Sequence, residues 1–388
     1  MKIKIDFEKS KNSYIYDKNT EKLYLDFFGQ YSSLAIGYNN DIFDKSFENE
    51  VSNIIKNKIS NSATDSDEEI ELKLKFKNFC SKNIFNEVYF CCTGSLAVES
   101  AVKAAFDYKQ FENPEIITFS GSFHGVNSFS CSLTDRFEPV NQRLDGYPKK
   151  YGHLINYNPN INNINDCIEK IKHIIEEQKN IAGILIEPIQ CTYGDRYYPY
   201  IFFKKIREIC THYDVPMIFD EIQTGFGVTG KLWYFEHIDI IPDIVIFGKK
   251  AQLSGFMIQD KFSKIFENHT KLEVTWNSTI IDMIRSKYII NYFIKNKLLE
   301  NVNRISNLFY NGLNNLENIF NLRITGFLIA FDLESKNKRD LFNKLLNENG
   351  IICNPTRDIT IRFRPSLNLS EIDAVKAIKI ITNINKLL

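Results

Sequence analysis

The sequence lacks the features that mark secreted, membrane-spanning and nucleic-acid-binding proteins. Its 48 basic residues are balanced by 48 acidic residues, so it has no excess of positive charge with which to bind nucleic acid or an anionic membrane. No segment approaches the ~20 apolar residues that a membrane-spanning helix needs, and the opening MKIKIDFEKS lacks the apolar stretch of a secretory signal. We therefore expect a cytoplasmic protein with no nucleic-acid or membrane partner.

The sequence also offers little to suggest disulfide bonds or a metal site. Its eight cysteines are scattered and form no C-x-x-C motif, which favours reduced thiols. Its six histidines show no metal-ligand spacing. There is no internal repeat and no low-complexity linker. The sequence therefore predicts a globular protein without a disulfide framework and without a metal, and 388 residues suffice for two or three domains.

Helical and strand patterns alternate through the middle of the chain, which predicts an α/β fold with helices on the faces of a sheet. Apolar spacing predicts a helix over about 95–109 and a long helical stretch from about Ser286, leading into a smaller C-terminal unit. Two capping boxes, in which a hydroxyl and an acid satisfy N–H groups of a first helical turn, are Ser66-x-x-Glu69 and Ser370-x-x-Asp373.

Three short apolar runs are the most informative feature of the sequence. They occupy residues 181–186, 215–219 and 244–247, are rich in Ile and Val, and are typical of fully buried parallel strands. Ligands bind beyond the carboxyl ends of such strands. The residues that follow the three runs are polar or charged: Glu187-Pro188, Asp220-Glu221 and Gly248-Lys249-Lys250. This pattern predicts a site at that edge of the sheet.

The chemistry of this site depends on a lysine and an aspartate. Burial of Lys249 at a strand end would lower its pKa and free the neutral amine to form a Schiff base; Lys250 could fill the same role. Asp220, buried at the end of the preceding run, needs a cationic partner, and a protonated pyridine nitrogen is one. Taken alone, a solvent-exposed lysine and a helix-capping aspartate are the commoner explanations.

Two glycine-containing motifs bear on a phosphate group. Thr93-Gly94-Ser95 precedes the predicted helix, whose free N–H groups and dipole can bind a phosphate, although ordinary capping explains most such tripeptides. Gly225-x-Gly227-x-x-Gly230 has the spelling of a dinucleotide-binding motif. Five residues separate it from the strand and no good helix start follows it, so we set that interpretation aside.

These residues belong to a longer pattern that resembles the signature of class III aminotransferases, which are pyridoxal-phosphate enzymes of fold type I. The signature runs over 220–230 and resumes over 242–249, and lysine 6-aminotransferases are the most similar group. The likeness covers nearly the whole chain and also includes Leu25-Asp26-Phe27-Phe28-Gly29, Ser60-Asn61-Ser62, Phe123-His124-Gly125, Glu187-Pro188-Ile189-Gln190, Gly248-Lys249-Lys250-Ala251-Gln252, Thr275-Trp276 and Arg362-Phe363-Arg364-Pro365. It implies an N-terminal segment (1–60) at the active-site mouth, a large cofactor domain with a mainly parallel sheet (61–285) and a small C-terminal α/β domain (286–388).

The resemblance also implies roles for single residues. Lys249, rather than Lys250, would form the Schiff base with pyridoxal 5′-phosphate and move a proton, and Asp220 would pair with the pyridine nitrogen. The other implied cofactor contacts are Gly94 and Ser95 with the phosphate, Phe123 on the ring face, Gln223 with the ring hydroxyl, and Glu187. Thr275 matches a threonine that reaches the phosphate of a neighbouring subunit, which implies a homodimer with shared sites.

Arg362 matches an arginine that binds a substrate carboxylate through two hydrogen bonds. Arg364 shares its strand face, so residue type alone does not choose between them. Two departures concern the substrate. The family arginine that binds the α-carboxylate of lysine is Val126 here, and the family glutamate that masks the carboxylate-binding arginine is Thr192. Loss of a charge-assisted contact costs about 1.5–3 kcal/mol, which argues against efficient transamination of free lysine.

The sequence thus predicts amino-group transfer between an amine or amino acid and a keto acid such as 2-oxoglutarate. Two alternatives stay open. The same lysine and aspartate serve mutases, racemases and decarboxylases on this fold, and a degenerate relative could act as a binding protein without cofactor. The second alternative does not explain why Lys249, Asp220, Gln223 and Phe123 are all present.

Overall fold

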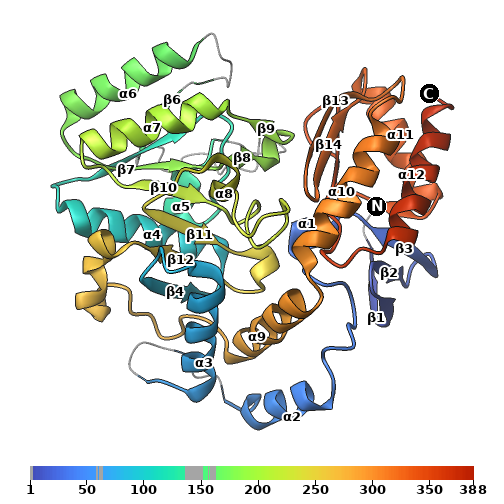
Figure 1. The fold of residues 1–388 in the computed structure, drawn as a ribbon, viewed down its shortest axis with the longest axis horizontal. Helices are drawn as coiled ribbons and strands as arrows, with labels where there is room; N and C mark the ends of the chain where they lie inside the picture. The colour runs from blue at the N-terminus through green and yellow to red at the C-terminus, as the bar shows by residue number, and fades with distance from the viewer. Residues whose placement is uncertain (1–2, 58–59, 61–63, 136–151, 156, 158–162) are drawn as a thin grey trace.

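The computed structural model of the protein describes residues 3–57, 60, 64–135, 152–155, 157 and 163–388 (Figure 1). Most of the predicted Ser60-Asn61-Ser62 motif lies outside these ranges. No helix in the described ranges is both long and apolar enough to cross a membrane.

A seven-stranded sheet forms the centre of the larger part of the molecule (Figure 1). In spatial order its strands are β4 (Glu87–Cys91), β12 (Ser254–Ile258), β11 (Ile244–Phe247), β10 (Met217–Asp220), β7 (Ile181–Ile186), β5 (Glu115–Phe119) and β6 (Gly152–Ile155). Neighbours from β11 to β6 pair in parallel, whereas β12 runs antiparallel to both of its neighbours. The predicted mainly parallel sheet is confirmed.

The three predicted apolar runs form β7, β10 and β11. The middle strand begins at Met217 rather than at Val215, because Pro216 has no N–H for the ladder and the Val215 N–H donates to the Cys210 carbonyl of the preceding helix. Every residue of the three strands is buried. Burial on both faces explains why their sequences are apolar throughout and turn polar only where the strands end.

Alternate side chains of the central strands pack into two different helical layers. One layer contains α4 (Gly94–Lys109), which packs against Ile116, Leu185, Ile218 and Ile246. The other contains α6 (Ile164–Gln178) and α7 (Tyr200–His212), whose apolar faces share a core with Ile117, Ile184, Phe219 and Val245. The sheet therefore lies between helices, as the alternating patterns predicted.

The C-terminal part of the chain has its own sheet and joins the N-terminal strands. Its antiparallel sheet is β13 (Phe320–Thr325), β14 (Leu328–Asp332) and β16 (Thr360–Phe363), accompanied by α10 (Leu298–Leu313), α11 (Lys336–Glu348) and α12 (Glu371–Asn385). A second sheet combines β1 (Ile5–Lys11), β2 (Tyr14–Asp17) and β3 (Lys22–Asp26) with β15 (Ile351–Ile352), which pairs with β3 in parallel. The two ends of the chain therefore lie beside each other (Figure 1).

Both predicted capping boxes are confirmed as helix starts. Ser66 Oγ accepts the N–H of Glu69 in α3 (Asp67–Phe76), and Ser370 Oγ accepts that of Asp373 in α12. The long helix α9 (Ile280–Lys295) begins earlier than the predicted Ser286 because Thr279 caps it by accepting the Asp282 N–H. The remaining short elements are α1 (Gly29–Ser32), α2 (Lys45–Ile54), α5 (Ser128–Ser132), α8 (Phe235–Ile238), β8 (Ile189–Gln190) and β9 (Arg196–Tyr197).

Candidate active site

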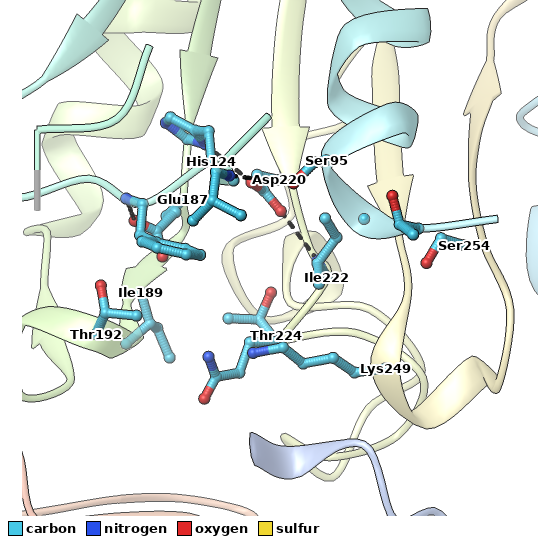
Figure 2. A pocket seen from close by; sticks show the side chains of 16 residues that line it. Ser95, His124, Glu187, Ile189, Thr192, Asp220, Ile222, Thr224, Lys249 and Ser254 are labelled. Atoms are coloured by element: carbon cyan, nitrogen blue, oxygen red, sulfur yellow. Dashed lines mark hydrogen bonds and ion pairs between the residues drawn. The ribbon is translucent and has the colours of Figure 1, made fainter. Parts of the chain in front are cut away.

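A pocket of about 280 Å³ opens beyond the carboxyl ends of β7, β10 and β11 (Figure 2). The structure brings most of the predicted site residues into its wall: Gly94, Ser95, Phe123, Val126, Glu187, Thr192, Asp220, Gln223 and Lys249. Residues from five different parts of the chain thus converge at the edge of the sheet that the three apolar runs predicted.

Lys249 comes directly after β11 and Gly248. Its backbone adopts a left-handed conformation with φ of +47°, which is unusual for a residue with a side chain. Burial lowers the pKa of its ammonium to about 8, and Arg362 and Arg364 add to this effect, while Cys191 and Asp220 oppose it. Figure 2 shows no hydrogen bond from Lys249 to the other lining residues. The side chain can therefore offer a neutral amine to a ligand in the pocket.

Asp220 is buried at the end of β10 and contacts His124. Asp220 Oδ2 lies 2.8 Å from His124 Nδ1, and Oδ1 accepts the N–H of Ile222 at 3.2 Å. An ionised carboxylate only accepts hydrogen bonds, so the proton of this pair belongs on His124 Nδ1. Among the described residues, His124 Nε2 has no hydrogen-bond partner although it is buried. The pair therefore presents a fixed acidic oxygen to the pocket.

Glu187 provides a second buried acid at the end of β7. Burial raises the pKa of its carboxyl well above the usual range, and the nearby charge of Asp220 raises it further. Its Oε1 accepts the backbone N–H of Phe123 at 2.6 Å. Burial therefore favours the protonated form of Glu187, and its hydrogen bond fixes the segment that carries Phe123.

The start of α4 forms part of the pocket wall, through Thr93, Gly94 and Ser95. Thr93 caps the helix by accepting the N–H of Leu96, and the N–H groups of Gly94 and Ser95 belong to the first helical turn, where they have no acceptor within the helix. A Cβ at Gly94 would come within 3.0 Å of Ile222 Cδ1. The absence of a side chain at this position therefore keeps open the anion-binding end of the helix.

The two arginines of β16 and the residues after it differ in their surroundings. Arg364 is buried, donates to Gln223 Oε1 at 3.1 Å, and forms an ion pair with Asp195. Arg362 donates to the backbone carbonyls of Cys191 and Asn354, at the junction between the C-terminal sheet and the loop that carries Thr192. The structure thus assigns Arg364 a structural ion pair, which residue type alone could not do.

Two predicted residues do not line this pocket within the single chain. Arg362 donates to the carbonyl of Cys191, the residue directly before Thr192 of the pocket wall. Thr275 is exposed. A role for Thr275 at a neighbouring subunit stays a prediction. Val126 is 64% exposed at the pocket mouth, and Thr192 lines the wall with a hydroxyl that has no partner among the described residues.

Sequence reasoning missed two buried polar residues of the site. His124 received no role, although the Phe-His-Gly motif contains it, and Asp195 received none, although it directly follows a glycine in the loop after β8. Both act through partners that are distant along the chain: Asp220 for His124, and Arg364 for Asp195. Only the folded structure reveals such pairs.

The chain is similar to known aminotransferases along nearly its whole length. The family model for class-III aminotransferases matches residues 1–384. The L-lysine-epsilon aminotransferase of Mycobacterium tuberculosis is 30% identical over 405 residues, covering 97% of this chain and 90% of that protein. The 4-aminobutyrate aminotransferase of Saccharomyces cerevisiae is 31% identical over 415 residues, covering 94% and 86%.

A solved structure agrees with these similarities. The lysine aminotransferase of M. tuberculosis in the internal aldimine form superposes with a TM-score of 0.93 at 29% identity, covering 100% of this chain and 95% of that one. The predicted family, fold class and amino-transfer activity are confirmed. The chain belongs to the class III aminotransferase family.

Proposed function

We propose that this pyridoxal-phosphate-dependent aminotransferase transfers an amino group from an amine other than free lysine to a keto acid bearing a carboxylate, in two half-reactions. One observation carries this proposal. Lys249 and Asp220 line the same pocket, at the ends of neighbouring parallel strands.

The residues around the pocket suit the cofactor. When bound, pyridoxal phosphate withdraws electrons from the reacting carbon of the substrate. Asp220, fixed by His124, would accept a hydrogen bond from the ring nitrogen and favour its protonated form. Phe123, Gln223 and Glu187, which line the same pocket, would contact the ring. The backbone N–H groups of Gly94 and Ser95 would hold the phosphate.

Lys249 has two tasks in this proposal. Its amine would hold the cofactor covalently between turnovers, which the lowered pKa of about 8 favours because about a tenth of the amine is neutral at pH 7. When it is not bonded to the cofactor, Nζ would act as the general base and acid that accepts a proton from the substrate and returns it at a second position. No hydrogen bond joins this amine to another lining residue in Figure 2, so no such bond has to break before it moves.

The substrate preference follows from the charges at the pocket mouth. Val126 offers no charge to a carboxylate, and Thr192 cannot form an ion pair that would mask Arg362. We therefore expect Arg362 to bind the carboxylate of substrates such as glutamate or 2-oxoglutarate. We expect the amine donor to carry no carboxylate on the part that contacts Val126, because this side chain is apolar and is 64% exposed.

Three further assignments belong to this proposal. The protein acts as a homodimer in which Thr275 of each subunit completes the phosphate site of the other, consistent with the exposure of Thr275 in the single chain. It functions in the cytoplasm. Residues 61–285 form the cofactor domain and residues 286–388 form the small domain. Residues 1–60 form a segment at the mouth of the active site. Helix α9 crosses the boundary between the two domains near residue 285.

A screen of amine donors with 2-oxoglutarate as acceptor tests the proposal. Glutamate formation and the loss of the cofactor's visible absorbance would be measured for free lysine, 4-aminobutyrate, and larger amines that lack a carboxylate near the reacting end. We expect lysine to be used at least about tenfold less efficiently than the best donor, since it lacks a charge-assisted contact at Val126. Fast turnover of lysine at low concentration would contradict the proposal.

A further inference from the structure

The loop that carries Lys249 contains a second buried lysine with a different set of contacts. Lys250 is only 2% exposed and, unlike Lys249, does not line the pocket. Its Nζ donates to the carbonyl of Leu34 at 2.9 Å and to the carbonyl of Pro365 at 2.9 Å. One side chain thus joins three parts of the chain: the loop after β11, the N-terminal segment and the segment after β16.

Leu34, the N-terminal partner of Lys250, follows a turn of unusual conformation and donates its N–H to the Gly29 carbonyl of that turn. Four consecutive residues from Gly29 to Ser32 adopt positive φ angles of 55°, 50°, 57° and 72°, which L-residues rarely adopt in succession. The Asp26 carboxylate holds the turn by accepting the N–H groups of Phe28 and Gly29. A Cβ at Gly29 would come within 2.2 Å of the Arg364 carbonyl. The turn is therefore packed directly against the segment that contains Arg362 and Arg364.

A second side chain makes a parallel connection. Gln252 Nε2 donates to the Ser33 carbonyl at 2.5 Å and to the Lys249 carbonyl at 3.1 Å. Lys249 and Gln252 both have positive φ, at 47° and 65°. A backbone conformation of this kind persists only where the surroundings hold it. Backbone hydrogen bonds close this loop from within, from the Ala251 N–H to the Gly248 carbonyl and from the Gln252 N–H to the Lys249 carbonyl. The contacts of Lys250 and Gln252 with residues 33, 34 and 365 hold it from outside.

We propose that Lys250 is a positioning residue, which fastens the left-handed backbone of Lys249 to the N-terminal turn and to the segment that carries the substrate-binding Arg362. This inference rests on the function proposed above. It assigns to the two adjacent lysines separate tasks: Lys249 reacts, and Lys250 fixes where Lys249 points and how far it stands from the carboxylate end of the substrate.

The chemistry of the amine agrees with this task. Burial lowers the pKa of Lys250 to about 7, with Arg364 adding to the effect and Asp26 opposing it. A neutral amine still has two N–H donors, and the structure offers it two carbonyl acceptors. The connection therefore does not require the ammonium form.

The test compares Lys250→Met, which has similar volume and no donor, with Lys109→Met. Lys109 is also a largely buried lysine that donates to a backbone carbonyl, that of Asp214 at 2.7 Å, but at the opposite end of the sheet. The first measurement is hydrogen exchange of peptides covering residues 27–36 and 363–368 in the protein freed of cofactor. We expect about tenfold faster exchange in Lys250→Met, as the loss of about two neutral hydrogen bonds implies, and no change there in Lys109→Met.

The second measurement uses the loaded protein. Lys250→Met should lower kcat about tenfold with little change in KM, and should displace the pH midpoint of the bound cofactor's absorbance change, whereas Lys109→Met should do neither. If Lys250→Met does not fold, Gln252→Glu, which replaces a donor with an acceptor on a partly exposed residue, is expected to give the same changes.

The proposal is overturned if the Lys250 variant, or the Gln252 variant in its place, matches Lys109→Met in both measurements. Failure of the proposed function would look different: the wild-type protein would then use free lysine rapidly at low concentration, whereas the exchange measurement in the cofactor-free protein would still test the contacts of Lys250.

Discussion

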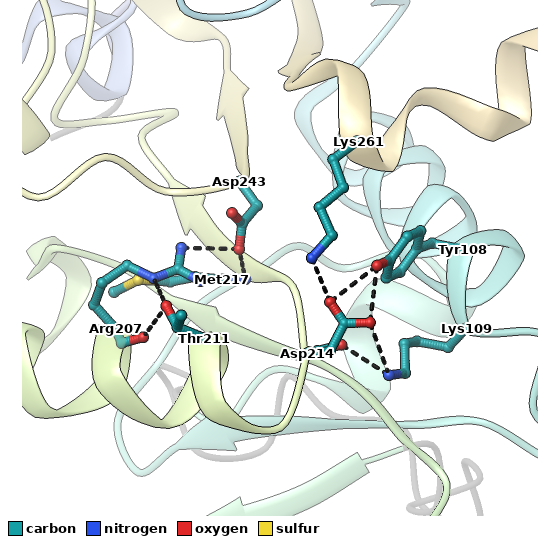
Figure 3. Close-up of polar contacts among 8 residues, drawn as sticks. All are labelled: Tyr108, Lys109, Arg207, Thr211, Asp214, Met217, Asp243 and Lys261. Carbon is teal, nitrogen blue, oxygen red and sulfur yellow. Dashed lines mark hydrogen bonds and ion pairs between the residues drawn. The ribbon is translucent and has the colours of Figure 1, made fainter.

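Charged side chains at the two ends of the central strands differ in whether they have hydrogen-bond or ion-pair partners within the protein. At the amino ends of β10 and β11, Asp214 and Asp243 are each surrounded by protein donors (Figure 3). Asp243 accepts from Arg207 at 2.9 Å and from the Met217 N–H at 2.7 Å. Asp214 accepts from Tyr108 and Lys261. At the carboxyl ends, Lys249 has no such contact in Figure 2, and the two acids stand close enough for one to raise the pKa of the other.

This difference separates charges that serve stability from charges that serve chemistry. Buried charges in proteins are normally paired, and the amino-end group follows that rule. At the carboxyl ends, the Lys249 amine and His124 Nε2 have no hydrogen-bond partner among the residues drawn in Figure 2. Buried polar groups of this kind are expected where a bound ligand supplies the partner. The comparison predicts that substitutions at one end change activity and substitutions at the other change stability.

The largest effect is expected from Lys249→Ala. Removing the amine that moves the proton should lower the rate of amino transfer by about 10²–10⁴-fold or more, while the protein still folds and binds the cofactor without a covalent bond. Initial rates and the absorbance of the bound cofactor would be measured, with Lys109→Met as the matched control at the other end of the strands. A Lys249 variant that retained a tenth of the activity would break the comparison.

Asp220→Asn should have the next largest effect. The amide keeps the shape of the side chain but not its charge, so the ring nitrogen loses a charge-assisted hydrogen bond worth about 1.5–3 kcal/mol, or roughly one to two decades in rate. Turnover would be compared at saturating cofactor. The melting temperature should change little, and a large drop in melting with unchanged turnover would assign Asp220 to stability instead.

Arg207→Met should show the reverse pattern. Without the guanidinium, Asp243 keeps the Met217 N–H but loses its cationic partner while 5% exposed, which should cost about 1–3 kcal/mol of unfolding free energy. Urea unfolding and turnover per folded molecule would be measured together. We expect the midpoint to fall and the turnover to stay within twofold of wild type; a tenfold loss of turnover would blur the distinction between the two ends.

The smallest effect concerns the pH dependence of stability, which should have opposite signs at the two ends. Burial raises the pKa of Asp214, but hydrogen bonds from Lys261 and Tyr108 and the charges of Lys261 and Lys109 outweigh burial and leave this pKa below its usual value. Its stabilisation is therefore present above its unfolded pKa near 4 and lost as the pH falls through the folded value. The pKa of Glu187 is raised, so its cost appears as the pH rises above about 4.5.

Melting curves of Asp214→Asn and Glu187→Gln between pH 3 and pH 8 would check these signs. Relative to wild type, Asp214→Asn should lose its disadvantage at the lowest pH, and Glu187→Gln should gain stability as the pH rises. Equal slopes for the two variants would contradict the contrast between Asp214, which forms an ion pair with Lys261, and Glu187, whose carboxyl accepts from a backbone N–H.

Local patterns in the sequence predicted much of this fold. The runs at 181–186 and 244–247 became strands with those bounds, because a strand buried on both faces must be apolar along its whole length. Capping boxes predicted the starts of α3 and α12 for an equally local reason. The antiparallel β12 and the pairing of β3 with β15 were not predicted, since such pairings depend on contacts between distant residues rather than on any short pattern.

The site was predictable to the same extent. Lys249, Asp220 and Gly94 stand at strand or helix ends that the sequence reveals. The choice between Lys249 and Lys250 came from resemblance, because the contacts that distinguish them involve residues 34 and 365. His124 and Asp195 escaped prediction because each is meaningful only beside a partner from another strand or loop.

The most direct test of the account is to identify the lysine that bonds to the cofactor. Purified protein loaded with pyridoxal phosphate would be reduced with borohydride and digested, and the peptide over 248–252 would be sequenced by mass spectrometry. We expect the added mass of the reduced cofactor on Lys249 and an unmodified Lys250. Label on Lys250, or no label in this peptide, would contradict the account.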